Sequence, residues 1–141
     1  GRVGEIVQVD PAPIMAVANA GFVPVVAPIG VDADGLSYNV NADEASGAIA
    51  RALQAEKLIL LTDVEGVKDA AGELIHRLSV EKARKLLAEG SIREGMIPKV
   101  ECCIDALSDG VARTHIIDGR IVHAILLEVF TDGGVGTLLT H

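Results

Sequence analysis

The sequence predicts an α/β fold, in which a layered sheet carries helices on both faces. Apolar runs typical of buried strands alternate along the chain with segments whose apolar residues recur at the three- and four-residue spacing of a helix. The hydrophobic half of the composition consists mainly of small and branched aliphatic residues, which suit a buried sheet between helices. In such folds ligands bind at the carboxyl ends of the strands.

The first third of the chain is expected to supply a helix between extended segments. Residues 3–9 read as a strand or hairpin, and Asp10 with Pro11 then starts a helix over residues 11–19 that Gly21 ends. Residues 23–29 form a near-continuous apolar run, which predicts a strand buried on both faces. Residues 30–38 lack an apolar period and predict a turn or hairpin.

The remaining elements alternate more regularly. The spacing of apolar residues predicts helices over residues 42–54, 79–89 and 96–107, of which the first would be capped by Asn39 or Asn41 and the second opened by Ser79 and ended by Gly90. Strands are expected over residues 57–61, 114–117 and 136–139, and residues 121–130 are expected to be partly helical.

Composition argues against several classes of protein. A net charge of −8 opposes binding to a phosphate backbone, and only three aromatic residues are present to stack on bases, so a nucleic-acid partner is not expected. The sequence has no apolar run of the roughly 20 residues needed to cross a bilayer, so no membrane partner is expected either. A cytoplasmic location is the expectation.

The two cysteines, Cys102 and Cys103, are neighbours within a predicted helix, where side chains diverge by about 100°. They are therefore expected to be core residues in a reduced compartment, without a disulfide. The sequence also lacks a cluster of histidines and cysteines at metal-ligand spacing, and no protein-held metal site is predicted. Because the chain begins at Gly1, within an apparent strand, we interpret it as a fragment that forms a single domain.

Polar residues are concentrated at the ends of the predicted strands and helices, whereas the common glycine-rich nucleotide motifs are missing. Three ordered clusters stand out: N-V-N-A-D at residues 39–43, L-L-T-D-V-E-G-V at residues 60–67, and G-M-I-P-K at residues 95–99. Together with their spacing, these clusters resemble acetylglutamate kinases over essentially the whole chain.

The resemblance implies a three-layer αβα sandwich with a mostly parallel open sheet, as in amino-acid and carbamate kinases. It implies ATP with Mg²⁺ as cofactor, and transfer of the γ-phosphoryl group to N-acetyl-L-glutamate. In that family the phosphate loop, one catalytic lysine and the substrate-holding arginine lie in an N-terminal half. Residues 1–141 would then be the C-terminal nucleotide-binding portion, inactive by itself and part of a homo-oligomer in the intact enzyme.

Three residues match family positions in the phosphoryl-transfer site. Lys99 resembles the lysine that contacts the transferring phosphoryl group, and Asp43 the aspartate that organises the catalytic lysines. Asn39 resembles the asparagine that binds the substrate α-carboxylate. Each has an ordinary alternative: Lys99 as a solvated lysine, Asp43 as a first-turn carboxylate, and Asn39 as a helix cap.

Two further groups carry expectations from the resemblance. The residues expected to border the nucleotide are Asp63, Val64, Glu65, Gly66, Val67, Lys68, Ser91, Ile92, Arg93 and Met96. The tail resembles that of arginine-inhibited members, with His123, Glu128 and Gly136 as candidate contacts for an arginine effector. The alternatives are a plain strand-to-helix turn for the first group and an exposed glutamate for Glu128.

Two other functions remain open on the sequence. The fragment could be a non-catalytic nucleotide- or arginine-binding module, since it lacks a phosphate loop. It could also derive from another member of the class, such as a carbamate, glutamate, aspartate or uridylate kinase.

Overall fold

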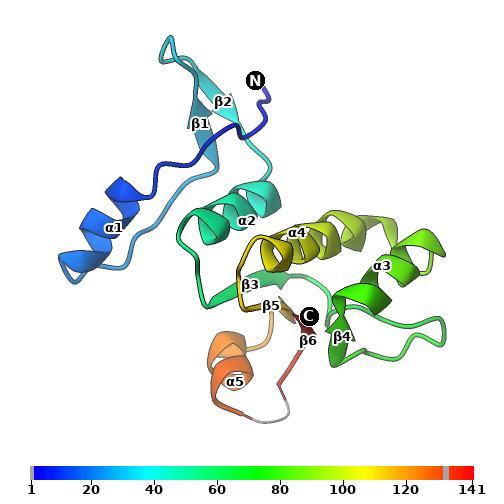
Figure 1. Cartoon of the computed structure of the whole chain (residues 1–141). Helices are drawn as coiled ribbons and strands as arrows, with labels where there is room; N and C mark the ends of the chain where they lie inside the picture. The colour runs from blue at the N-terminus through cyan, green and yellow to red at the C-terminus, as the bar shows by residue number, and fades with distance from the viewer. Residues whose placement is uncertain (1, 132–133) are drawn as a thin grey trace.

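The computed structural model describes residues 2–131 and 134–141, and shows a sheet-and-helix body from which the N-terminal part of the chain projects (Figure 1). Its elements, in chain order, are α1 (Ala12–Asn19), β1 (Ile29–Val31), β2 (Ser37–Asn39), α2 (Ala42–Ala52), β3 (Lys57–Thr62), β4 (Arg77–Ser79), α3 (Val80–Ala88), the 3-10 turn η1 (Glu94–Met96), α4 (Ile97–Ser108), β5 (Arg113–Asp118), α5 (Ala124–Phe130) and β6 (Thr137–Thr140).

The main sheet has four strands in the order β3-β5-β6-β4. Strands β3 and β5 are parallel, β4 and β6 are parallel, and β5 and β6 are antiparallel. The register pairs Thr62 with Asp118, so β3 and β5 end at the same edge of the sheet. Because Ile116 pairs with Thr137, β6 begins near that edge. The expected mostly parallel open sheet is confirmed, with one antiparallel pairing.

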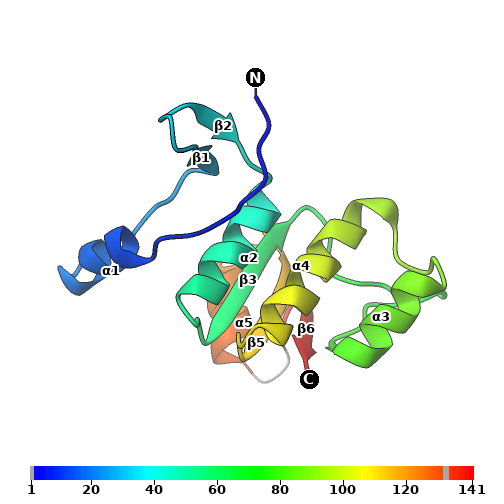
Figure 2. The same ribbon diagram turned by 45° about the horizontal axis from the view of Figure 1, so that its top comes forward.

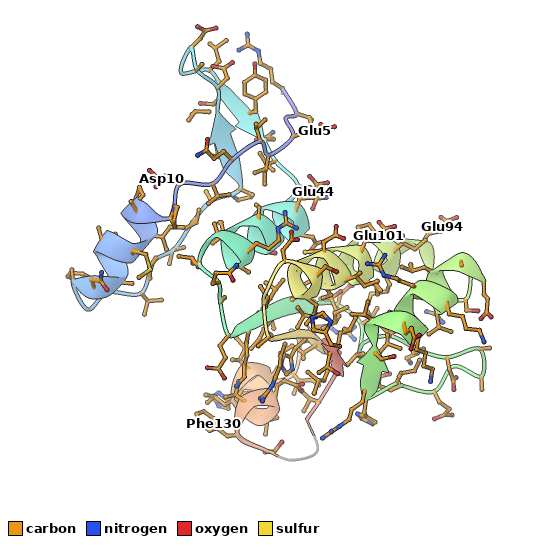
Figure 3. All side chains as sticks on the ribbon, viewed as in Figure 1. Glu5, Asp10, Glu44, Glu94, Glu101 and Phe130 are labelled. Atoms are coloured by element: carbon orange, nitrogen blue, oxygen red, sulfur yellow. The ribbon has the colours of Figure 1, made fainter. Side chains whose placement is uncertain are left out.

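Helices cover both faces of this sheet, which confirms the predicted αβα layering. Helices α2 and α4 lie on one face, α3 extends that layer beside β4, and α5 lies against the other face (Figures 1 and 2). Helix α4 packs through Val100, Cys103 and Leu107, each at most 1% exposed. Its opposite side carries Glu101, which points away from the sheet (Figure 3).

Capping residues fix where the helices start and stop. Asn41 accepts hydrogen bonds from the N–H groups of Asp43 and Glu44 at the start of α2, and Ser79 accepts one from Lys82 at the start of α3. The alternative role of Asn39 as the cap of α2 is therefore wrong. Gly90 follows α3 with a φ of +66°, a conformation that glycine adopts without strain.

The expected buried strand over residues 23–29 is wrong. Residues 22–27 carry no regular secondary structure, and Val23 and Val25 are 88% and 94% exposed. The apolar run matches a buried strand in composition, but in the part of the chain that the structure describes only its last residue, Ile29, belongs to a strand, β1, and it is 59% exposed. Helix α1 likewise has no buried residue, although its predicted bounds are confirmed within one residue.

The segment before α1 also differs from expectation. Of residues 3–9, only Val3 forms a β-bridge, with Asn39. The hairpin expected over residues 30–38 is confirmed, since β1 pairs with β2 in an antiparallel two-stranded sheet. Asp32 holds its turn by accepting hydrogen bonds from Leu36 N–H and from the Tyr38 hydroxyl at 2.9 Å each.

The cysteines behave as expected of core residues. Cys102 and Cys103 are free thiols, 8% and 0% exposed, and Cys102 faces α2. Burial raises the pKa of Cys103 to about 12, so the thiol stays protonated. Within residues 2–131 and 134–141, no helix has the length and apolar character to cross a membrane.

We predict that Gly136→Ala destabilises the fold. A Cβ at this position would collide with the backbone oxygen of Ile116 and lie 2.7 Å from Cγ2 of Ile117, in a central strand that its neighbours hold in place. Overpacking of this kind costs about 1–3 kcal/mol in the free energy of unfolding, measurable by urea denaturation. Gly95→Ala, where a Cβ would meet nothing within 4 Å, is the matched control. Equal stability of the two variants would contradict the prediction.

Candidate functional site

The carboxyl ends of β3 and β5 form one corner of a cleft. Thr62 and Asp118 end the two strands side by side, and Gly119 donates its N–H to the Thr62 carbonyl at 2.8 Å. Polar residues that follow each strand therefore meet at one edge, as expected for parallel strands.

The cleft has a volume of about 430 Å³. This is the size range of small-molecule sites, roughly 300–1,000 Å³. All ten residues that the sequence marked as bordering a nucleotide line it, and the structure adds five that the sequence analysis missed: Asp69, Ala70, Gly72, Asp118 and Arg120. The signal for Asp118 and Arg120 was available, because they follow a predicted strand just as Asp63 does.

Gly66 allows the wall of the cleft to lie tightly against the sheet. Its φ is +148°, and a Cβ would lie 2.6 Å from Thr137 Oγ1 and 2.8 Å from Leu74 Cδ1. The next residue, Val67, donates its N–H to Thr137 Oγ1 at 2.9 Å. Gly66 thus brings the loop close to the protein's own β6.

The rest of the cleft combines charged and apolar groups. Lys68 Nζ lies 2.7 Å from Glu65 Oε2, and this bond holds the pKa of the Glu65 carboxyl below its ordinary value. The side chains of Ile92 and Met96 are 6% and 7% exposed and form an apolar part of the lining. Such a surface suits a flat apolar ring, while the charged loop suits polar groups.

Asp43 and Lys99 form an ion pair beside this cleft. Lys99 Nζ donates to both Asp43 carboxylate oxygens, at 3.0 and 2.8 Å, and the two side chains are 23% (Asp43) and 19% (Lys99) exposed. Lys99 is half-buried, which excludes the alternative of a freely solvated lysine. Asp43 also lies in the first turn of α2, so both of its expected roles are compatible with the structure.

Hydrogen bonds to the Asp43 carbonyl fix the position of the pair, but neither Asp43 nor Lys99 lines the cleft. The Asp43 carbonyl accepts a hydrogen bond from Ser46 Oγ within α2 at 2.8 Å and one from Cys102 Sγ at 3.1 Å, which ties α2 to α4. Lys99 lies about one helical turn beyond Met96, a lining residue. The structure therefore places the pair next to the cleft rather than inside it.

Asn39 lies at the end of β2, and its backbone is fully used. Its N–H donates to the Arg2 carbonyl at 2.8 Å, and its carbonyl accepts from Gly4 N–H at 3.0 Å. The side chain is exposed and makes no hydrogen bond to another residue that the structure describes. Asn39 is thus available for a ligand, although no contact joins it to Asp43 or Lys99.

The three tail residues lie in different settings on the α5 side of the sheet. His123 is exposed and precedes α5 with a φ of +60°, whereas Gly136 packs against β5. Glu128 is only 4% exposed, so its alternative as an exposed glutamate is wrong. Asp132 and Gly133 of the tail motif lie outside the described residues.

Glu128 is bound within the protein on both carboxylate oxygens. His115 Nδ1 lies 2.7 Å from Oε1, and the Val135 N–H donates to Oε2 at 2.7 Å. Sequence analysis missed His115, whose only signal was a polar residue inside an apolar strand. Burial opposes ionisation of Glu128, but the bonds from Val135 and His115 outweigh it and hold the pKa of this carboxyl below its ordinary 4.5.

The fold and the strand ends define an α/β protein with a cleft at the carboxyl edge of its sheet. The chain belongs to the amino acid kinase family, whose model matches residues 1–118. It is 57% identical to the acetylglutamate kinase of Geobacter metallireducens over 97% of this chain and 47% of that enzyme, and 55% identical to that of Halorhodospira halophila over 99% and 46%. The chain thus spans about half the length of the curated relatives that it matches.

Solved structures agree with this assignment. The chain is similar to N-acetylglutamate synthase from Neisseria gonorrhoeae complexed with coenzyme A and L-arginine, with a TM-score of 0.92 and 31% identity over 99% of this chain and 32% of that one. Carbamate kinase from Giardia lamblia bound to AMP-PNP shares the fold, with a TM-score of 0.68 and 20% identity over 99% of this chain and 46% of that one.

The buried Glu128 should make stability depend on pH. Because its folded pKa is lowered, ionised Glu128 stabilises the fold above pH 4.5, and this contribution is lost as the pH falls through the folded pKa. We therefore expect Glu128→Gln to reduce the free energy of unfolding at neutral pH, with a gap to the wild type that narrows below pH 4.5. Urea denaturation across that range measures it, and a constant gap would count against the assignment. Glu101→Gln, an exposed site, is the matched control.

Proposed function

We propose that the chain is the nucleotide-binding portion of an acetylglutamate kinase, which transfers the γ-phosphoryl group of ATP to the γ-carboxylate of N-acetyl-L-glutamate. The observation that carries the proposal is the Asp43–Lys99 pair beside a cleft lined by the ten residues that resemble the family's nucleotide contacts. The identity of 55–57% to acetylglutamate kinases favours this acceptor over carbamate, glutamate, aspartate or uridylate.

The chemistry needs positioning more than acid–base catalysis. A substrate carboxylate is already ionised at neutral pH, so it can attack the γ-phosphorus in line without a general base or a covalent enzyme intermediate. Negative charge spreads over the transferring oxygens, and the Lys99 ammonium can stabilise it. Asp43 holds that ammonium in one place through both carboxylate oxygens, which limits the rearrangement needed during transfer.

ATP would be accompanied by Mg²⁺. Throughout residues 2–131 and 134–141, no three side chains of His, Cys, Asp or Glu are grouped to hold a metal ion. A magnesium ion would be carried mainly by phosphate oxygens and water, as Mg²⁺ usually is in kinases. Bound there, it would neutralise phosphate charge.

Substrate binding is assigned to Asn39. Its amide group is exposed and is not needed as the cap of α2, which Asn41 supplies. An amide N–H₂ can donate to the α-carboxylate of N-acetylglutamate. Since that carboxylate is remote from the reacting bond, the contact would be equally strong before and during transfer.

The complete enzyme would need an N-terminal half in addition to residues 1–141. The chain spans 46–47% of the length of the acetylglutamate kinases that it matches. In addition, α1 and the extended residues 22–27 bury no side chain, which agrees with a requirement for further protein contacts. Alone, the chain would act as a nucleotide- or arginine-binding module without turnover. A kinase assay on the isolated chain tests this.

Inhibition by arginine forms a second part of the proposal. It is supported by the tail motif and by similarity to a synthase crystallised with L-arginine. His123, Glu128 and Gly136 would contribute to this site. Glu128 keeps acceptor capacity beyond its two bonds, and it also sets the position of Val135 next to Gly136. We also propose that the intact enzyme is a homo-oligomer in the cytoplasm. The exposed Phe130 at the end of α5 could lie in the interface between its subunits (Figure 3).

Lys99→Ala should lower kcat by about a hundredfold or more, because the lost charge acts mainly on the transition state. The KM for N-acetylglutamate should change little. Steady-state kinetics of the full-length protein measures both constants. Lys82→Ala, an exposed lysine on α3, is the matched control and should leave both unchanged.

Asn39→Ala supplies the contrast within the same experiment. It should raise the KM for N-acetylglutamate with kcat nearly unchanged, since it removes a uniform binding contact. If Lys99→Ala raised KM at normal kcat, Lys99 would be only a binding residue.

Arginine at millimolar concentration is expected to inhibit the enzyme, and Glu128→Gln should relieve this inhibition without lowering uninhibited turnover. The substitution removes the anion that a guanidinium would meet and weakens the bonds that position the tail. Inhibition curves of the wild type, Glu128→Gln and the control Glu101→Gln measure the effect. An enzyme indifferent to arginine would leave the tail motif as a structural turn only.

A further inference from the structure

Two charged residues of the cleft, Asp118 and Arg120, lie at the end of β5 and just after it. Neither was among the residues that the family resemblance marked. Asp118 is the last residue of β5, and Arg120 comes two positions later; both line the cleft. The hydrogen bond from Gly119 N–H to the Thr62 carbonyl places this corner directly beside Asp63, the first residue after β3.

Arg120 is held rigidly at one end and exposed at the other. Its Nε donates to Asp118 Oδ1 at 2.9 Å, and its Nη2 donates to Oδ2 at 2.8 Å. The backbone N–H of Arg120 donates to the same Oδ1 at 2.9 Å. The Asp118 side chain is 7% exposed, whereas that of Arg120 is 66% exposed. This fork-to-fork pair pre-organises a guanidinium whose remaining N–H groups are open to the cleft and to solvent.

The residues that line the cleft carry more negative than positive charge, so a negatively charged ligand needs a cation there. The lining carries the carboxylates of Asp63, Glu65, Asp69 and Asp118 against the cations Lys68, Arg93 and Arg120. A polyphosphate would bring several further negative charges into this excess of carboxylates. Asp118 first, and then Asp63 and Glu65, raise the pKa of Arg120.

We propose that Arg120 makes the cleft tolerant of a polyphosphate, because its fixed guanidinium offsets the carboxylates of Asp63, Glu65 and Asp118. This inference rests on the proposed function, since it takes the ligand of the cleft to be a nucleotide. It assigns to one side chain, at the end of β5, the electrostatic selection of a phosphorylated ligand. Arg120 acts as a positioning and specificity residue and takes no part in the bond changes.

The test compares the ATP affinity of the full-length protein at two ionic strengths, with magnesium present. The variants are Arg120→Gln, Arg120→Lys and the control Arg113→Gln, which removes the same charge from the exposed opposite end of β5. At low salt, Arg120→Gln should raise the Kd for ATP about tenfold, equivalent to about 1.4 kcal/mol. The difference should shrink at high salt, where charges are screened. Arg120→Lys should stay within about threefold of the wild type, because the charge is kept.

The outcomes separate the inference from the function on which it rests. An ATP affinity of Arg120→Gln within about twofold of the wild type would overturn the inference alone. A loss that is the same at both ionic strengths and equal in Arg120→Lys would also overturn it, since shape rather than charge would then be responsible. A wild-type protein that binds no ATP would overturn the proposed function together with the inference. Thermal unfolding of each variant verifies that it is folded.

Discussion

The parallel pairing of β3 with β5 is the constraint on which the rest of the structure depends. Six residue pairs, from Lys57 with Arg113 to Thr62 with Asp118, align the two strands so that they end together. The cleft exists because loops leave the sheet at this common edge, and β6 starts close enough for Thr137 to hold the loop at Val67. A shift of one residue would turn every side chain of a strand to the opposite face.

Two ion pairs with buried or half-buried side chains lie on opposite faces of the main sheet. On the face covered by α2 and α4, Lys99 of α4 pairs with Asp43 of α2, and Cys102 Sγ donates to the carbonyl of Asp43. On the other face, His115 pairs with Glu128 of α5. Strand β5 contacts both α4 and α5, so the sheet separates the two pairs.

Several polar side chains in this fold are held by fixed hydrogen-bond partners. Asp118 and Glu128 are buried carboxylates that accept both backbone and side-chain hydrogen bonds. Arg120 and Asn39 are held only in part. One end of the Arg120 guanidinium is bound to Asp118, and the backbone of Asn39 is hydrogen-bonded, while their remaining polar groups are exposed. Pre-organisation of this kind lowers the entropic cost of binding a ligand.

The sequence by itself determined the order and type of most elements, because helix caps such as Ser79, stop glycines such as Gly90 and buried runs such as residues 57–61 act through local chemistry. A family resemblance carried by three sequence motifs, and not local chemistry, marked ten of the fifteen residues that line the cleft. Only the tertiary structure decided that residues 23–29 stay exposed, that Glu128 is buried against His115, and that Arg120 is fixed by Asp118 at the cleft. These outcomes depend on which surfaces pack together across the sheet, and no local pattern of apolar or charged residues encodes the partner that a side chain meets there.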